Sequence, residues 1–185
     1  MNISYRKLMP WLGAAVLVAA AMVRLNASVY VLDGIMLFFP LADPAWSPPP
    51  FLPQLRQHAP AWAAVLLSTA ILLLRYPDHS QYFAAMLLTA AIPEEWFFRA
   101  YLLVRAGDDW RANIAVSVFF GFMHGITWGW VAGTLVFVPS LFYGWLYQRT
   151  RDVTLLALVH ALSNLVFVIY LSVPLNSWLV GHGIA

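Results

Sequence analysis

Long apolar segments follow one another along almost the whole of this 185-residue chain. Hydrophobic residues make up 62% of it and charged residues only 10%, whereas soluble domains contain about 25% charged residues. So few charges cannot cover a water-exposed surface, and disordered chains combine low hydrophobicity with high charge. The composition therefore excludes a soluble globular protein and a disordered one. It predicts a polytopic membrane protein whose apolar segments cross the bilayer as α-helices.

Seven segments are candidates for these membrane-spanning helices, so the expected fold is an all-α transmembrane bundle. They cover residues 8–23, 29–41, 59–74, 80–104, 112–126, 130–148 and 153–172. Several are shorter than the about 20 residues that a perpendicular helix needs to cross a bilayer, so six to eight spans are compatible with the sequence. The segment 29–41 contains Asp33 and ends at Pro40, and its alternative interpretation is an interfacial or re-entrant segment.

The basic residues between the segments predict the orientation of the bundle. With seven spans and a cytoplasmic N-terminus, only Arg24 and Arg75 lie outside the cell, whereas the cytoplasmic side receives Arg6, Lys7, Arg56, Arg105, Arg111, Arg149 and Arg151. Without the segment 29–41 this bias almost disappears. Because positive charges concentrate on the cytoplasmic side, the sequence favours seven spans, with the N-terminus inside.

The chain is predicted to form one membrane-embedded domain over residues 1–185. Residues 42–58 are the longest polar stretch, and their prolines predict an extended connector. The N-terminal segment resembles a signal peptide, and we expect it to be retained as a signal anchor. The net charge is only +2 and the chain contains no cysteine. Nucleic-acid binding, disulfides and thiolate chemistry are therefore not expected.

Both glutamates of the chain lie next to each other in the fourth segment, as Glu94 and Glu95. Ionisable residues inside a bilayer are costly and usually functional. Glu95 and Arg99 are four residues apart in the favourable acid-before-base order, so they are expected to form an ion pair, which by itself is a structural feature. Glu94 points about 100° away around the helix. We therefore expect it either to be protonated or to meet a polar group from another helix.

Two later segments supply such partners, namely His124 in the fifth segment and His160 with Asn164 in the seventh. Taken singly, each is more often a structural residue. However, at a rise of about 1.5 Å per residue, all of these groups and Glu94 lie roughly 10 to 18 Å from the cytoplasmic ends of their spans. The common depth predicts that they converge near the middle of the membrane.

Three motifs contain these residues, namely Glu94-Glu95-x-x-x-Arg99, Phe120-x-x-x-His124 and His160-x-x-x-Asn164. Together they resemble the CAAX protease and bacteriocin-processing family of intramembrane glutamic endopeptidases. All three motifs are complete, in the family's order, and each lies on a predicted membrane helix. The resemblance covers residues 80–172, which we therefore expect to form the catalytic core. The first three segments and the connector carry no motif of the family.

The motif residues suit peptide hydrolysis, and the resemblance implies the same roles. Glu94 is expected to act as the general base that activates a water molecule, and His124 to hold that water and pass a proton to the leaving amine. His160 and Asn164 are suited to donate hydrogen bonds to the oxyanion. Glu95, Arg99 and Phe120 are expected to support the site structurally.

Other chemistries find less support in the sequence. No cofactor is expected, although Glu94, His124 and His160 are acceptable zinc ligands by type, so a metal-assisted mechanism stays open. The sequence contains no His-Glu-x-x-His motif, no Gly-x-Ser-x-Gly motif and no second membrane aspartate beside Asp33. Two alternatives outside proteolysis are a non-catalytic immunity or binding protein of the same fold and a proton-coupled transporter.

The resemblance implies a membrane-inserted protein or peptide as the substrate. It offers prenylated CAAX proteins, bacteriocin-type leader peptides and C-terminal sorting signals of exported proteins. The short chain favours a minimal bacterial enzyme in the inner membrane, and hence a sorting signal or a leader as substrate. Besides the lipid bilayer and the substrate no partner is predicted, and the sequence does not indicate an oligomeric state.

Overall fold

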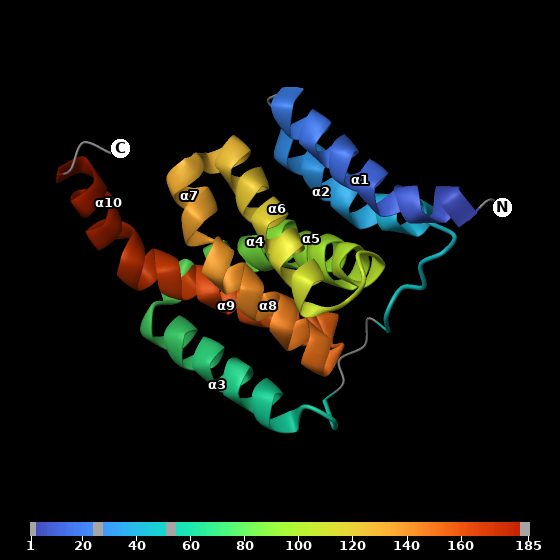
Figure 1. Ribbon diagram of the computed structural model, residues 1–185. Coiled ribbons are helices and arrows are strands. Elements are labelled where there is room, and N and C mark those ends of the chain that lie inside the picture. The colour runs from blue at the N-terminus through green and yellow to red at the C-terminus, as the bar shows by residue number, and fades with distance from the viewer. Residues whose placement is uncertain (1–2, 24–27, 51–54, 182–185) are drawn as a thin grey trace.

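The computed structural model describes residues 3–23, 28–50 and 55–181, and every regular element in these ranges is helical (Figure 1). All seven predicted segments are helical, so the all-α fold class is confirmed. Arg24 and Pro53, which entered the predictions of orientation and connector, lie outside the described residues.

The elements follow in this order: α1 (Ile3–Val23), α2 (Ser28–Phe38), a 3₁₀ turn η1 (Phe39–Ala42), α3 (Ala59–Arg75), a 3₁₀ turn η2 (Pro77–His79), α4 (Ser80–Met86), a π-helix η3 (Leu87–Ala91), α5 (Ile92–Glu94), a π-helix η4 (Glu95–Leu103), α6 (Trp110–Trp128), α7 (Trp130–Leu135), α8 (Phe137–Thr150), α9 (Val153–Val166), a π-helix η5 (Phe167–Leu171) and α10 (Ser172–Gly181). The helix from α4 to η4 lies between α1 and α2 on one flank and α3 and α9 on the other (Figure 1).

Two helices of the described chain are long and apolar enough to cross a membrane, Trp130–Thr150 and Val153–Leu175. A third candidate is the pair Ala59–Arg75 and Pro77–Leu103, which is bent by 117°. Large apolar side chains such as Leu74 and Val173 are exposed on the outside of the bundle, as expected for a surface in contact with lipid. The structure thus supports two to three membrane-spanning helices, and the seven-span arrangement stays a prediction.

The helix that carries both glutamates runs from Ser80 to Leu103 and includes Pro93 near its middle. Proline lacks a backbone N–H, and in an α-helix its ring clashes with the carbonyl four residues earlier. The wider π-helical turn Leu87–Ala91 precedes Pro93 and accommodates it without a break in the helix. The second π-helical stretch, η4, begins at Glu95, so Glu94 and Glu95 lie at the junction between two helical geometries.

Two buried aspartates connect the segments without motifs to the helices that carry the three motifs. Asp43, at the start of the connector, accepts hydrogen bonds from Arg105 Nε at 2.9 Å and from the Tyr101 hydroxyl at 3.2 Å. Asp152 caps α9 by accepting from the Leu155 N–H at 3.0 Å, and it also accepts from Trp62 Nε1 of α3 at 2.9 Å. These contacts join η1 to η4 and α3 to α9.

Helices α6 and α7 form a tight hairpin whose backbones touch. Gly129 makes the turn with φ +96°, a conformation that favours glycine. A methyl group on Gly133 would lie 2.5 Å from the Gly121 carbonyl oxygen and 2.9 Å from the Gly125 backbone nitrogen. The absence of side chains at Gly121 and Gly133 therefore lets the two helices pack closely.

We predict that Gly133→Ala destabilises the protein by about 1–3 kcal/mol, because the added methyl meets backbone atoms that cannot move without separating α6 from α7. The matched control is Gly34→Ala, where the methyl meets nothing within 4 Å. Alanine in this helical position is expected to be neutral or stabilising by about 0.5–1 kcal/mol. Thermal unfolding in detergent measures both changes, and equal melting temperatures for the two variants would contradict the prediction.

Candidate active site

Glu94, His124 and His160 come together from three helices. Glu94 ends α5, His124 lies in α6 and His160 in α9. Glu94 Oε1 is 4.0 Å from His124 Nε2, and Glu94 Oε2 is 3.7 Å from His160 Nε2. Both distances exceed a direct hydrogen bond, so the carboxylate faces both rings without a direct hydrogen bond to either. The structure thus unites three of the four residues to which the sequence assigned catalytic roles.

Glu95 is fully buried and joins two of the motifs. Its Oε1 accepts from Arg99 Nη1 at 3.2 Å and lies 2.7 Å from His160 Nδ1. The expected ion pair with Arg99 is therefore present, and a contact with His160 that the sequence did not reveal is added to it. Because a carboxylate paired with arginine only accepts hydrogen bonds, the proton of a neutral His160 ring lies on Nδ1.

This contact determines what His160 Nε2 can do. In the neutral ring Nε2 carries a lone pair, so it accepts a hydrogen bond. Donation of an N–H to an oxyanion, the expected role of His160, then requires a proton on Nε2 as well as on Nδ1. Glu95 thus contacts a proposed catalytic side chain directly, in addition to locking its own helix through Arg99.

Arg99 is buried and every part of its guanidinium is in contact with the protein. Nη2 donates to the Ser140 hydroxyl at 2.7 Å and to the Ser140 carbonyl at 3.3 Å. Its Cζ lies 4.6 Å from the centre of the Phe120 ring and 5.5 Å from that of Tyr143. A charge in an apolar interior needs such compensation. The guanidinium therefore holds α8, α6 and η4 together beneath the cluster.

His124 is oriented by its own helix. Its Nδ1 lies 3.1 Å from the Phe120 carbonyl oxygen, one turn earlier in α6, and its ring packs against the Phe120 ring at 4.3 Å between centroids. Since a carbonyl accepts, Nδ1 donates and Nε2 of the neutral ring points its lone pair at Glu94. Phe120 therefore lies between Arg99 and His124 and touches both.

Asn164 lies one turn beyond His160 on the same face of α9 and is partly buried. No hydrogen bond of its side chain is found among the described residues, and the structure shows no contact between its amide and the other three predicted catalytic residues. Its participation in the site stays a prediction.

Two residues at the site, Ser140 and Tyr143, were missed by the sequence analysis. Both lie on α8, where Ser140 accepts from Arg99 and the Tyr143 ring stacks on His160. A signal was present, because Ser140, Tyr143 and Tyr147 recur at helical spacing on one side of an apolar segment. Such a stripe indicates that this face of the helix points into the bundle. It does not predict which side chains of other helices the face contacts.

No group of three or more histidine, cysteine, aspartate or glutamate side chains with the geometry to hold a metal ion is found in the described ranges. Glu94, His124 and His160 are ligand types that zinc accepts, but in this conformation their atoms do not converge on one point.

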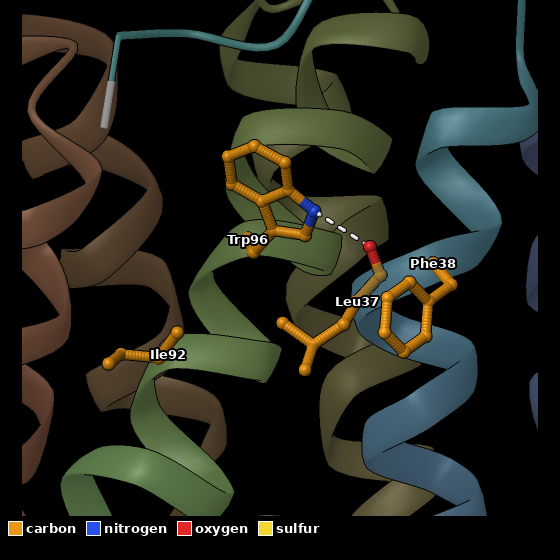
Figure 2. A pocket seen from close by; sticks show the side chains of 4 residues that line it. All are labelled: Leu37, Phe38, Ile92 and Trp96. Atoms are coloured by element: carbon orange, nitrogen blue, oxygen red, sulfur yellow. Dashed lines mark hydrogen bonds between the residues drawn. The ribbon is translucent and has the colours of Figure 1, made fainter.

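An apolar pocket of about 260 Å³ opens elsewhere, between α2 and the helix of the two glutamates (Figure 2). Leu37, Phe38, Ile92 and Trp96 line it, and Trp96 Nε1 donates to the Leu37 carbonyl at 3.2 Å. Ile92 and Trp96 are four residues apart and share a helix face, whereas Glu94 is two residues from each and points to the opposite side. The pocket is therefore separate from the carboxylate–histidine cluster.

Comparison with known proteins supports the resemblance drawn from the motifs. Residues 77–166 match a protein-family model described as type II CAAX prenyl endopeptidase, Rce1-like. This segment belongs to the Rce1-like family. It contains all three motifs, from Glu94 to Asn164, so the expected family is confirmed. Searches among curated proteins and among solved structures found no significant match.

The match to the Rce1-like model indicates the class of protein to which this segment is similar. The family comprises CAAX-type endopeptidases, which are hydrolases. Together with the apolar helices, the match identifies an integral membrane protein of a protease family. The matched residues run from η2 to the end of α9, so they include every described contact among Glu94, Glu95, Arg99, His124 and His160.

We predict that substitution of the two adjacent glutamates of the Rce1-like segment affects stability very differently. Glu95→Gln removes the negative charge between Arg99 and His160 and is expected to destabilise the protein by about 3–5 kcal/mol, because it leaves a buried guanidinium without its counter-ion. Glu94→Gln removes a carboxylate that makes no hydrogen bond to an arginine and is expected to unfold close to wild type. Thermal unfolding of both variants in the same detergent tests this contrast, and a stable Glu95→Gln variant would refute it.

Proposed function

We propose that this protein is an intramembrane endopeptidase in which Glu94 activates a water molecule for attack on a peptide bond. The observation that supports the proposal most strongly is that one partly exposed carboxylate faces the Nε2 atoms of two histidines, at 4.0 and 3.7 Å, inside a segment that matches a protease family. A water molecule bound to either oxygen of this carboxylate would lie next to a histidine, His124 on the Oε1 side and His160 on the Oε2 side.

The proposed hydrolysis begins when Glu94 takes a proton from the water as its oxygen bonds to the scissile carbonyl carbon. The carbonyl oxygen becomes an oxyanion, which Asn164 and protonated His160 stabilise by donating N–H bonds. The C–N bond then breaks, and the amine leaves with a proton that passes from Glu94 through His124. Water is consumed, and a carboxylate and an ammonium group are formed once the second proton of the water has also passed to the amine.

Glu95 and Arg99 have electrostatic roles in this scheme. The Glu95 carboxylate holds His160 Nδ1 so that Nε2 faces Glu94, and Arg99 compensates the buried Glu95 charge. Phe120 keeps Arg99 and His124 in place through its ring. Only Glu94, His124, His160 and Asn164 touch reacting atoms in the proposal.

The proposed setting is a bacterial inner membrane, with seven spans and the N-terminus in the cytoplasm. This arrangement places most loop arginines inside and the three motifs at a similar depth. The proposed substrate is the C-terminal sorting signal or the leader of a membrane-associated protein, because such a segment reaches a site within the bilayer from the lipid side. Prenylated CAAX proteins are the alternative substrate that the family name supplies.

Glu94→Gln is the test of the proposed base. It preserves the side-chain shape, and we expect cleavage to fall by about 10²- to 10⁴-fold, the usual contribution of a general base. The measurement is mass spectrometry of new termini after co-expression with candidate substrates that carry sorting signals, leaders or CAAX tails. Asp78→Asn, in the exposed turn η2, is the matched control. Cleavage by Glu94→Gln at the wild-type rate would overturn the assignment.

Chelation distinguishes this mechanism from a metal-assisted one. If Glu94 and the histidines act on water directly, we expect EDTA or 1,10-phenanthroline to leave the initial rate of cleavage unchanged. The purified protein is assayed before and after dialysis against chelator, and then after addition of zinc. Activity that is lost on chelation and restored by zinc would show that a metal holds the water.

A further inference from the structure

Tyr143 of α8 covers one face of the His160 ring. The two rings are stacked, with centroids 4.9 Å apart and an angle of 27° between their planes, and Tyr143 is only 3% exposed. The other ring contact of His160, with Phe120, is edge-on at 6.3 Å and 68°. The stacked face of Tyr143 is therefore the contact that defines the plane of the imidazole.

The orientation of the His160 ring plane determines whether its two nitrogens can reach their carboxylate neighbours. Nδ1 lies 2.7 Å from Glu95 Oε1, and Nε2 lies 3.7 Å from Glu94 Oε2. A rotation of the ring out of this plane moves both atoms away from their carboxylates. Rotation about the Cβ–Cγ bond is broad for histidine in the absence of packing, so the helix α9 alone does not hold this orientation.

Tyr143 is itself held firmly in the bundle. Arg99 Cζ lies 5.5 Å from its ring centre, and Ser140, one turn earlier, accepts from the same guanidinium. The next residue, Gly144, lies so close to α6 that a methyl group there would overlap the Asn113 side chain at 1.8 Å, and Asn113 Nδ2 donates to the Leu141 carbonyl at 3.0 Å. The position of α8, and with it the Tyr143 ring, is thereby set by contacts on both sides.

We propose that Tyr143 is a positioning residue that fixes the His160 imidazole in the orientation in which Nδ1 meets Glu95 and Nε2 meets Glu94. This inference rests on the proposed function for its effect on catalysis, but its effect on the ring is independent of activity. The flat face of the tyrosine performs this role, and the hydroxyl is not required for it.

Three variants separate positioning from general stability. Tyr143→Leu removes the flat face, and Tyr143→Phe keeps the ring but removes the hydroxyl. Tyr147→Leu is the matched control, because Tyr147 is equally buried one turn along α8 and its ring contacts Arg151 instead of a histidine. Thermal unfolding establishes that the two leucine variants are folded to a similar extent.

The first readout is the tautomer of His160, measured by ¹⁵N NMR of histidine-labelled protein in detergent, with the signal assigned from its absence in His160→Gln. At a pH where the ring is neutral, we expect one form in wild type, Tyr143→Phe and Tyr147→Leu, protonated on Nδ1. In Tyr143→Leu we expect a mixture of tautomers. A single, unchanged tautomer in Tyr143→Leu would overturn the inference whether or not the protein is a protease.

The second readout is the split between kcat and KM for a cleaved substrate. Misplacement of a reacting group by about 1 Å lowers rates by about 10²-fold, so we expect Tyr143→Leu to lose at least about tenfold in kcat with little change in KM. Tyr143→Phe is expected to restore the wild-type kcat. Equal kcat values for Tyr143→Leu and Tyr147→Leu would contradict positioning, whereas an inactive wild type would refute the proposed function and leave the NMR result to decide on Tyr143.

Discussion

The bundle is organised around one buried ionic chain that runs from Arg99 through Glu95 to His160. A charge in an apolar interior is tolerated only when its partners are close and its hydrogen bonds are made. Meeting this condition requires η4, α8 and α9 to pack in one arrangement, because Ser140 and His160 come from different helices than the pair itself. The same arrangement leaves Glu94, the neighbouring residue, facing two histidines. The need to neutralise Arg99 and Glu95 thus determines where the chemically useful carboxylate points.

The sequence predicted the helices and the proximity of several ionisable residues, for identifiable reasons. Ionisable residues are so rare here that Glu94, Glu95 and Arg99 stand out, and helical spacing alone predicts the Glu95–Arg99 pair. The convergence of Glu94 with His124 and His160 followed from their similar depths. The contact of Glu95 with His160 was not predictable, because both residues had other plausible partners and the rotation of α9 about its axis is set by packing. Tyr143 and Ser140 escaped notice for a similar reason, since a tyrosine or serine in an apolar helix has many structural uses.

The π-helical turns on both sides of Pro93 are a second feature that the sequence did not predict. A proline within an apolar segment predicts a local disturbance of the helix, but the form of the disturbance depends on the space around it. Here the helix widens over Leu87–Ala91 and again from Glu95 onward. Such widening changes the angle between successive side chains. At this junction Glu94 and Glu95 face the two different nitrogens of the same His160 ring, Nε2 and Nδ1.

Asp43 and Asp152, the two buried aspartates, form hydrogen bonds between the family-matched segment and the residues that precede it. The family match begins at residue 77, yet Asp152, which caps the helix of His160, is bound by Trp62 of α3, and Arg105 is bound by Asp43. A fragment that starts where the match starts would lack Trp62 and Asp43 and would leave Asp152 and Arg105 without these contacts inside the bundle. The segment that carries the recognisable motifs therefore makes some of its buried hydrogen bonds with the region without motifs, and these bonds would be lost in such a fragment.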